Sequence, residues 1–310
     1  MKGLHILFYH LVCNTKKDHY PLQNTVSIKL FNEQVKYFSQ KYEIITINEA
    51  YNRFLSGAKF DKQLVITTDD GFVENYTTIC PILESYNVNG SFFLIENSID
   101  NIQMMWRHAL FVLESKNQNL RLQGAISSLA QKFNISQLRN KEGLLNWSYR
   151  TFPYKLKEQL TNELWNEVMP FSLSEYLNKI KPYLNSSQIK EMLRNGHVIG
   201  NHSRSHPICS SLNEEELKFE IYDSVKSLGD KYNTDVVAFS FPFERSYHAT
   251  EILKKVFSDV KVLLGTVMKR KSNSNSPYYW ERMNMETKKF KSRLLIEPLK
   301  NELLHHEHSY

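Results

Sequence analysis

The sequence LVITTDDGF at residues 64–72 joins a strand-like run to two adjacent carboxylates. Its first five residues are apolar or β-branched, which is typical of a buried strand. The run stops at Asp69, Asp70 and Gly71, although Asp-Gly is also a common turn dipeptide. Successive side chains point in different directions, so one carboxylate could bind a metal while its neighbour faces an attacking water. The stretch therefore predicts a buried strand that ends in a polar site.

Strand-like and helix-like segments alternate on both sides of this stretch. The repeat predicts parallel strands whose functional ends lie on one side of the sheet. We expect one of the helices to be capped by Asn48. On the amino-terminal half, the expected strands are 4–9, 42–47, 64–68 and 91–95, and the expected helices are 31–40, 48–55 and 76–88, the last interrupted near Pro81.

Residues 101–185 break this alternation. They form helical segments rich in Asn, Gln, Lys and aromatic residues, without a convincing strand. We interpret them as a helical insertion within a single catalytic domain that spans residues 1–310. Alternation then resumes with a helix ending at Gly196, a strand at 197–201 and an amphipathic helix at 212–232 capped by Asn213. Further strands are expected at 236–243 and 260–267, with a helix at 250–257 between them.

The segment HSRSHP at residues 202–207 follows the strand at 197–201 directly. His202 and His206 would lie on one face if the backbone made a helical turn, and imidazole is a preferred ligand for zinc-like cations. A histidine pair at this spacing also occurs as surface decoration. Combined with one aspartate, however, the pair gives three protein ligands and leaves positions for water and substrate, as a catalytic metal site requires.

Three motifs occur in the same order as in a known family. LVITTDDGF (64–72), GNHSRSHP (200–207) and FSFPFE (239–244) resemble the successive motifs of the polysaccharide deacetylases, the carbohydrate esterases that share the NodB homology domain. The segment FYH (8–10) and residues 42–48 resemble the opening of that family's members. The resemblance implies a distorted (β/α) barrel with its site at the carboxyl ends of the strands.

The resemblance also assigns roles to individual residues. It implies that Asp70, His202 and His206 bind a divalent metal, most readily zinc, with cobalt, nickel or manganese as alternatives. Asp69 then corresponds to the general base that accepts a proton from the attacking water. The backbone N–H of Phe243 is the candidate donor to the oxyanion, although a plain strand ending at a proline would look the same.

The sequence departs from the family pattern at three points. Ser240 stands where many members have an arginine that braces the base, so the brace must come from elsewhere. Glu244 stands where a glycine is usual. The late Leu-x-His motif, which supplies the general acid, has no clear counterpart. His248 is a possible substitute, with an exposed loop histidine as the alternative.

Other side chains are weaker candidates for the site. His10, at the end of the first strand, would face the same rim as Asp70. Trp106 at the start of the insertion and Trp280 in the late segment YYWERMN could stack on a sugar ring, although packing explains them equally well. Cys209 could add a metal ligand, but a buried core thiol is the simpler interpretation.

Composition limits the classes of substrate that we expect and the cellular compartment in which we expect the protein. The net charge of +6 favours an anionic ligand or a solvated lysine-rich surface, and no arginine-rich aromatic segment indicates a nucleic-acid groove. Three scattered cysteines, no signal-peptide pattern and no apolar run of roughly 18 residues predict a cytoplasmic protein without a transmembrane segment. We therefore expect removal of an N-acetyl group from a nucleotide-linked or lipid-linked amino sugar in surface polysaccharide synthesis. A deformylase, another amide hydrolase and a glycan-binding pseudoenzyme are the alternatives.

Overall fold

The computed structural model describes residues 3–116, 120–243, 247–256, 261–265 and 279–287. The strands in these ranges form one sheet in which every pairing is parallel. The order is β8-β7-β6-β5-β4-β3-β1-β9, and β2 pairs with β3 beside this path. The strands are β1 (Leu4–Tyr9), β2 (Glu43–Ile44), β3 (Gln63–Thr68), β4 (Ser91–Leu94), β5 (Val198–Asn201), β6 (Ala238–Ser240), β7 (Val262–Gly265), β8 (Tyr279–Glu281) and β9 (Met283–Asn284).

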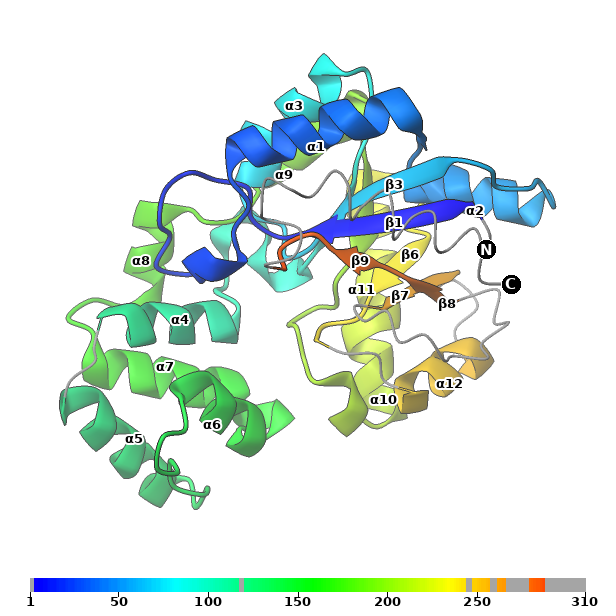
Figure 1. The fold of residues 1–310 in the computed structure, drawn as a ribbon. Helices are drawn as coiled ribbons and strands as arrows, with labels where there is room; N and C mark the ends of the chain where they lie inside the picture. Colours follow the sequence, from blue (N-terminus) through cyan, green and yellow to red (C-terminus); the bar gives the residue numbers. More distant parts are fainter. Residues whose placement is uncertain (1–2, 117–119, 244–246, 257–260, 266–278, 288–310) are drawn as a thin grey trace.

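The two ends of this path meet. β8 and β9 are separated in sequence by Arg282 alone, yet they pair with opposite edges of the sheet, β7 and β1. The sheet must therefore curl into a nearly closed barrel, around which the helices lie (Figure 1). This confirms the expected distorted (β/α) barrel, with Arg282 at its seam.

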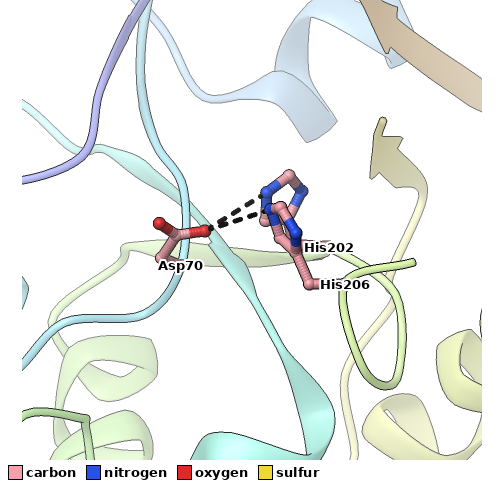
Figure 2. A group of neighbouring side chains, drawn as sticks. All are labelled: Asp70, His202 and His206. Atoms are coloured by element: carbon pink, nitrogen blue, oxygen red, sulfur yellow. Dashed lines mark ion pairs between the residues drawn. The ribbon is translucent and has the colours of Figure 1, made fainter. Parts of the chain in front are cut away.

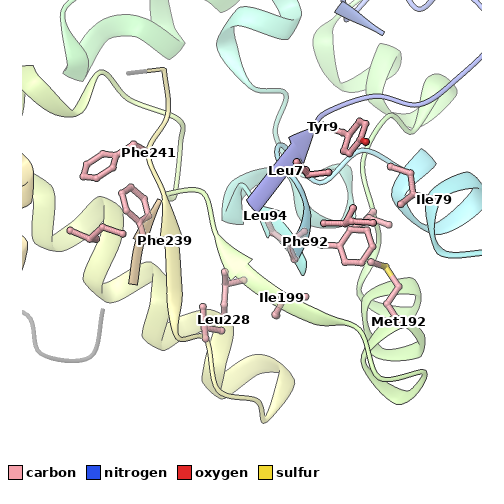
Figure 3. Close-up of a cluster of buried hydrophobic side chains, with 14 of the residues drawn as sticks. Leu7, Tyr9, Ile79, Phe92, Leu94, Met192, Ile199, Leu228, Phe239 and Phe241 are labelled. Atoms are coloured by element: carbon pink, nitrogen blue, oxygen red, sulfur yellow. The ribbon is translucent and has the colours of Figure 1, made fainter. Parts of the chain in front are cut away.

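Side chains of alternate strand residues pack in different hydrophobic clusters. Leu64 and Ile66 of β3 belong to the largest hydrophobic cluster, whereas Val65 belongs to another. Figure 3 shows members of the largest cluster gathered from β1, β4, β5 and β6 and from the helices packed on them. Since strand side chains alternate between faces, Thr67 and Asp69 continue the row of Val65 rather than that of Ile66.

The helices outside residues 101–185 cover the barrel. They are α1 (Ile28–Lys41), α2 (Ile47–Leu55), α3 (Cys80–Ser85), α9 (Ser186–Arg194), α10 (Glu214–Leu217), α11 (Asp223–Tyr232) and α12 (Tyr247–Val256), with π-helical turns at Asn75–Ile79 and Lys218–Tyr222 and short 3-10 turns at Leu22–Asn24, Glu96–Asn101 and Cys209–Ser211. None of the helices in the described ranges is long and apolar enough to cross a membrane.

Two helix starts test the sequence predictions. The prediction that Asn48 caps the second helix is wrong, because Thr46 is the N-cap. Its hydroxyl accepts from the Glu49 N–H while the Glu49 carboxylate accepts from the Thr46 N–H, which is the Thr-x-x-Glu capping box. Asn213 is a cap as expected, paired with Glu216 in the same way. The amphipathic helix that follows is interrupted by the π-helical turn at Lys218–Tyr222.

Residues 101–185, here called the helical lobe, gather on one side of the barrel in Figure 1. The lobe contains α4 (Trp106–Lys116), α5 (Leu120–Lys132), α6 (Leu144–Thr151), α7 (Lys157–Val168) and α8 (Leu173–Ile180). Its hydrophobic cluster, which includes Trp147 and Trp165, also takes in Leu11, Phe72 and Ile95. These three residues follow β1, β3 and β4, so the lobe packs onto the carboxyl ends of the strands.

Candidate active site

Asp69 and Asp70 follow β3 and point to different partners. The Asp69 N–H still donates to the Tyr9 carbonyl at 2.9 Å, which extends the β1–β3 ladder by one residue. Asp70 and Gly71 then adopt left-handed conformations, with φ of 71° and 67°. Such a turn is unusual for a non-glycine residue and redirects the chain sharply. The two neighbouring carboxylates therefore serve two separate sets of contacts.

The Asp70 carboxylate faces His202 and His206 (Figure 2). Its Oδ1 lies 3.3 Å from Nε2 of His202 and 3.7 Å from Nε2 of His206, and all three side chains are buried. Zinc bonds of about 2.0–2.2 Å at tetrahedral angles separate the ligand atoms by roughly 3.4 Å. Both separations from Asp70 Oδ1 are close to this value, and all three ligand atoms lie within 4.8 Å of one another, so the group could hold a cation.

The loop that carries the two histidines is not helical, so the helical turn that would have put them on one face does not form. Ser203 and His206 have φ of 69° and 56°, and these left-handed residues fold the loop back on itself. Asn201 Oδ1 accepts from the Ser203 N–H, and Ser203 Oγ accepts from the His206 N–H. Side-chain hydrogen bonds to the backbone therefore bring the two imidazoles together.

Hydrogen bonding leaves lone pairs directed at the centre of this group. His202 Nδ1 lies 2.8 Å from the Ser240 carbonyl, which can only accept, so Nδ1 carries the proton and Nε2 is a free ligand atom. Among the described residues, nothing donates a well-formed hydrogen bond to the buried Asp70 Oδ1. Burial raises the pKa of Asp70, but contacts with His108 and His202 lower it well below its usual value. An ionised carboxylate oxygen without a donor fits a cation better than a protein partner.

The Asp69 carboxylate is paired with Arg282. Nη1 donates to Oδ1 at 2.8 Å and Nη2 donates to Oδ2 at 2.7 Å. The remaining guanidinium donors contact the Thr67 hydroxyl, the Ser240 hydroxyl and the Gly265 carbonyl, so all five N–H groups are satisfied. Burial raises the pKa of Asp69, but the charge of Arg282 overcomes this effect and lowers it. The Asp69 carboxylate is therefore held ionised.

Arg282 supplies the brace that the sequence lacked at position 240. The Ser240 hydroxyl accepts from Arg282 Nη2 and lies 3.3 Å from Asp69 Oδ2, so the small side chain leaves room for the guanidinium and links it to the carboxylate. In the sequence, Arg282 is a charged residue of the late segment YYWERMN, without a local pattern that assigns it a role. Its pairing with Asp69 was not predictable from spacing, since the two residues are 213 positions apart.

A second histidine–carboxylate pair adjoins this group. His10 Nδ1 lies 2.8 Å from Glu286 Oε2, and Glu286 Oε1 accepts from the His10 N–H at 2.7 Å. Burial lowers the pKa of His10, but Glu286, together with Asp70 and Asp69, raises it to about 9. His10 follows β1, which pairs in parallel with β3, so it lies at the same end of the sheet as Asp69 and Asp70, as expected. Glu286 was not singled out from the sequence.

The family model described as polysaccharide deacetylase matches residues 56–124 and 157–257, which is more than half of the chain. The chain belongs to the polysaccharide deacetylase family. The matched residues include Asp69, Asp70, His202 and His206, whereas Arg282 and Glu286 lie beyond them. The unmatched residues 125–156 fall within the helical lobe. The resemblance drawn from the three motifs is thereby confirmed.

Solved structures share the fold of this deacetylase-family chain at low sequence identity. The Streptococcus pyogenes deacetylase PplD in complex with acetate has 16% identity and a TM-score of 0.59, covering 94% of this chain and 96% of that chain. IcaB from Ammonifex degensii has 15% identity and a TM-score of 0.57, covering 99% and 98%. A de-N-acetylase from Aggregatibacter actinomycetemcomitans has 14% identity and a TM-score of 0.55, covering 95% and 98%. No curated protein matches the sequence.

The other candidate residues differ in how they relate to the deacetylase site. Phe243 has φ of 61°, and the centroid of its ring lies 4.7 Å from that of the His206 ring, so its side chain packs beside the triad. Trp106 and Trp280 are each only 3% exposed, which leaves almost no ring surface for a sugar. Instead, Trp106 Nε1 donates to the His206 carbonyl at 3.0 Å. His248 is exposed on α12 and has no contact with the triad among the described residues.

Two further predictions concern residues at the margin of the site. Cys209 is a buried free thiol of the largest hydrophobic cluster and is not part of the triad, in agreement with a core thiol. Glu244 lies outside the described residues. The helical lobe contributes Arg107 and His108 to the surroundings of Asp70, and neither was assigned a role from the sequence.

Proposed function

We propose that this protein is a metal-dependent hydrolase that removes an N-acetyl group from an amino sugar. Membership of the polysaccharide deacetylase family supports a carbohydrate deacetylase. The observation that carries the finer proposal is the convergence of Asp70, His202 and His206, with the Asp69 carboxylate braced alongside by Arg282. This arrangement provides three ligands for a divalent metal, most readily zinc, and a separate base. Cobalt, nickel or manganese would also fit nitrogen and oxygen ligands.

The bound metal would supply Lewis-acid polarisation of the acyl carbonyl and a water of lowered pKa. Asp69 would accept the proton of the attacking water as the water oxygen adds to the acyl carbonyl carbon. The two hydrogen bonds from the Arg282 guanidinium fix the orientation of the Asp69 carboxylate and keep it unprotonated before the reaction. The backbone N–H of Phe243 is the proposed donor to the tetrahedral oxyanion, supported by its place against His206.

His10 is the proposed proton donor to the leaving amine, in place of His248. Its raised pKa keeps it protonated at neutral pH, and Glu286 fixes the ring through Nδ1. When the C–N bond breaks, the amine nitrogen takes the proton from His10, and acetate and the free amine are released. The hydrolysis is then balanced, with one proton accepted by Asp69 and one delivered by His10.

We propose that the substrate carries an anionic group, as a nucleotide-linked or lipid-linked sugar does. The Arg107 guanidinium lies 4.8 Å from the Phe243 ring and 5.8 Å from the Phe111 ring, and forms no ion pair among the described residues. Phe243 in turn packs on His206, so this cation borders the site. Arginine binds phosphate oxygens with paired hydrogen bonds, and the net charge of +6 is compatible with such a ligand. The proposed setting is surface polysaccharide synthesis on the cytoplasmic side.

Acetate release from acetylated amino sugars by the zinc-loaded protein tests the proposed reaction. Asp69→Asn should abolish release while zinc content, measured by metal analysis, stays near one per chain. Formate release from formylated sugars without acetate release would identify a deformylase instead. Sugar binding without turnover by the metal-loaded wild type would contradict the proposal and indicate a glycan-binding pseudoenzyme.

A further inference from the structure

His108, in the first turns of α4, reaches from the helical lobe to the metal-binding carboxylate. Its side chain is 1% exposed, and Nε2 lies 3.2 Å from Asp70 Oδ2. His202 and His206 do not contact this oxygen, because both face Oδ1. His108 therefore contacts the far side of the carboxylate from the cation position.

The hydrogen bonds of His108 define it as a donor to Asp70. Nδ1 lies 2.8 Å from the Tyr183 hydroxyl, which can donate, whereas the ionised Asp70 oxygen can only accept. The arrangement that satisfies both partners has the proton on Nε2 and the lone pair on Nδ1. The ring is also held by Phe72, whose centroid lies 4.8 Å away. Such a partner fixes the orientation of a ligand without binding the metal itself.

The lobe holds the histidine loop at two further points. Trp106, the first residue of α4, donates from Nε1 to the His206 carbonyl at 3.0 Å. Lys157, the first residue of α7, is buried and contacts Ser205 through the carbonyl at 3.1 Å and the hydroxyl at 2.8 Å. Ser205 is anchored from the other side by Glu220, which the π-helical turn places in the interior. The lobe thus touches Asp70 and the chain on both sides of the His206 peptide.

We propose that the helical lobe is a structural part of the metal centre, in which His108 is the positioning residue for Asp70 and metal binding stabilises the docked lobe. The proposal rests on the metal dependence of the proposed function. Its physical basis is that the lobe contacts fall on the ligand residues themselves, so any displacement of α4 moves Asp70 or the His206 backbone. Partners of this kind contribute about 10–100-fold to metal affinity.

The test compares zinc affinity in matched variants, measured by competition with a chromophoric chelator. His108→Phe keeps an aromatic ring but removes both hydrogen bonds, and the zinc dissociation constant should rise about 10–100-fold. His108→Gln can still donate to Asp70 and should recover part of this loss. The control is His197→Phe. His197 is equally buried and has its Nε2 3.2 Å from Glu84, but it lies at the opposite end of β5 from His202. Its zinc affinity should equal that of the wild type.

Equal zinc affinity in wild type and His108→Phe would overturn the proposal, as would an equal loss in His197→Phe. If His108→Phe does not fold, hydrogen exchange of the wild type decides. Zinc should slow exchange of the α4 and α7 amides, and unchanged exchange there would overturn the coupling. Acetate release is followed separately, so a protein that binds zinc as described but releases no acetate refutes the proposed function and leaves this inference standing.

Discussion

Replacing Arg282 by methionine removes the partner of a fully buried carboxylate. The side chains of Arg282 and Asp69 are 0% and 1% exposed, so solvent does not screen the pair. Breaking a buried ion pair by removing one partner costs about 3–5 kcal/mol, because the other charge stays buried and uncompensated. At about 2 °C per kcal/mol for a chain of this size, Tm should fall by roughly 6–10 °C at neutral pH.

The pH dependence of this loss follows from the lowered pKa of Asp69. A carboxylate whose pKa is depressed on folding contributes stability above its unfolded pKa and loses it as the pH falls through the folded value. The stability gap between wild type and Arg282→Met should therefore shrink in acid. Without Arg282, burial raises the pKa of Asp69, so the acid limb of the kcat/KM profile should move to higher pH.

Two variants make this prediction specific. Arg282→Lys keeps the positive charge but cannot form the bidentate contact with Asp69. Its Tm and the position of its acid limb should lie between those of the wild type and Arg282→Met. The control is Arg150→Met, which removes the bidentate ion pair between Arg150 and Glu142 in the helical lobe. The two hydrogen bonds of that pair are 2.9 and 2.7 Å long, and both side chains are partly exposed to solvent. This control variant should change stability less and leave the acid limb in place. An Arg282→Met protein with wild-type Tm and an unmoved acid limb would refute the assignment of Arg282 as the brace.

Three other predictions concern the donor, the substrate and the metal. Glu286→Gln should move the alkaline limb of kcat/KM to lower pH, because Glu286 raises the pKa of His10; an unmoved limb would exclude His10 as the donor. Arg107→Gln should raise KM for N-acetylglucosamine 1-phosphate roughly 10–100-fold with little change for neutral N-acetylglucosamine; equal effects on both sugars would contradict an anion contact. Chelation should abolish acetate release and lower Tm, and zinc at 100 times its Kd should restore about 2.7 kcal/mol of stability; activity that survives complete chelation would count against metal dependence.

Local signals in the sequence predicted much of the fold and the triad. The β-branched run before Asp69 forms a strand that ends at Thr68 as expected and begins one residue earlier, at Gln63, and the histidine pair follows a strand as expected. Parallel strands bring their carboxyl ends to one edge, which is why Asp70 and His202 could be expected to meet. The cap at Thr46 was also present in the sequence, as the Thr-x-x-Glu spacing, but the helical pattern placed the helix start two residues too late.

Three of the supporting residues that sequence reasoning missed, Arg282, Glu286 and His108, contact residues far away in the chain. Arg282 and Glu286 follow β8 and β9, whose pairing with opposite edges of the sheet has no local signature. His108 meets Asp70 only because the helical lobe packs onto the strand ends. The left-handed conformations of Ser203 and His206 depend on hydrogen bonds that periodicity does not encode. Motif order located the reacting groups, whereas their supporting contacts required the tertiary structure.

The position of Arg282 at the barrel seam has a consequence for biosynthesis. Asp69 leaves the ribosome 213 residues before its counterion, an interval of roughly 10–40 s at ordinary translation rates. Until β8 and β9 dock, the Asp69 carboxylate has no guanidinium to neutralise its charge. Burying an unpaired charge is costly, so the end of β3 should stay hydrated until then. The Asp69–Arg282 pair is therefore among the last contacts that the nascent polypeptide can form, and a chain released before residue 282 would contain Asp70, His202 and His206 but no guanidinium to hold Asp69.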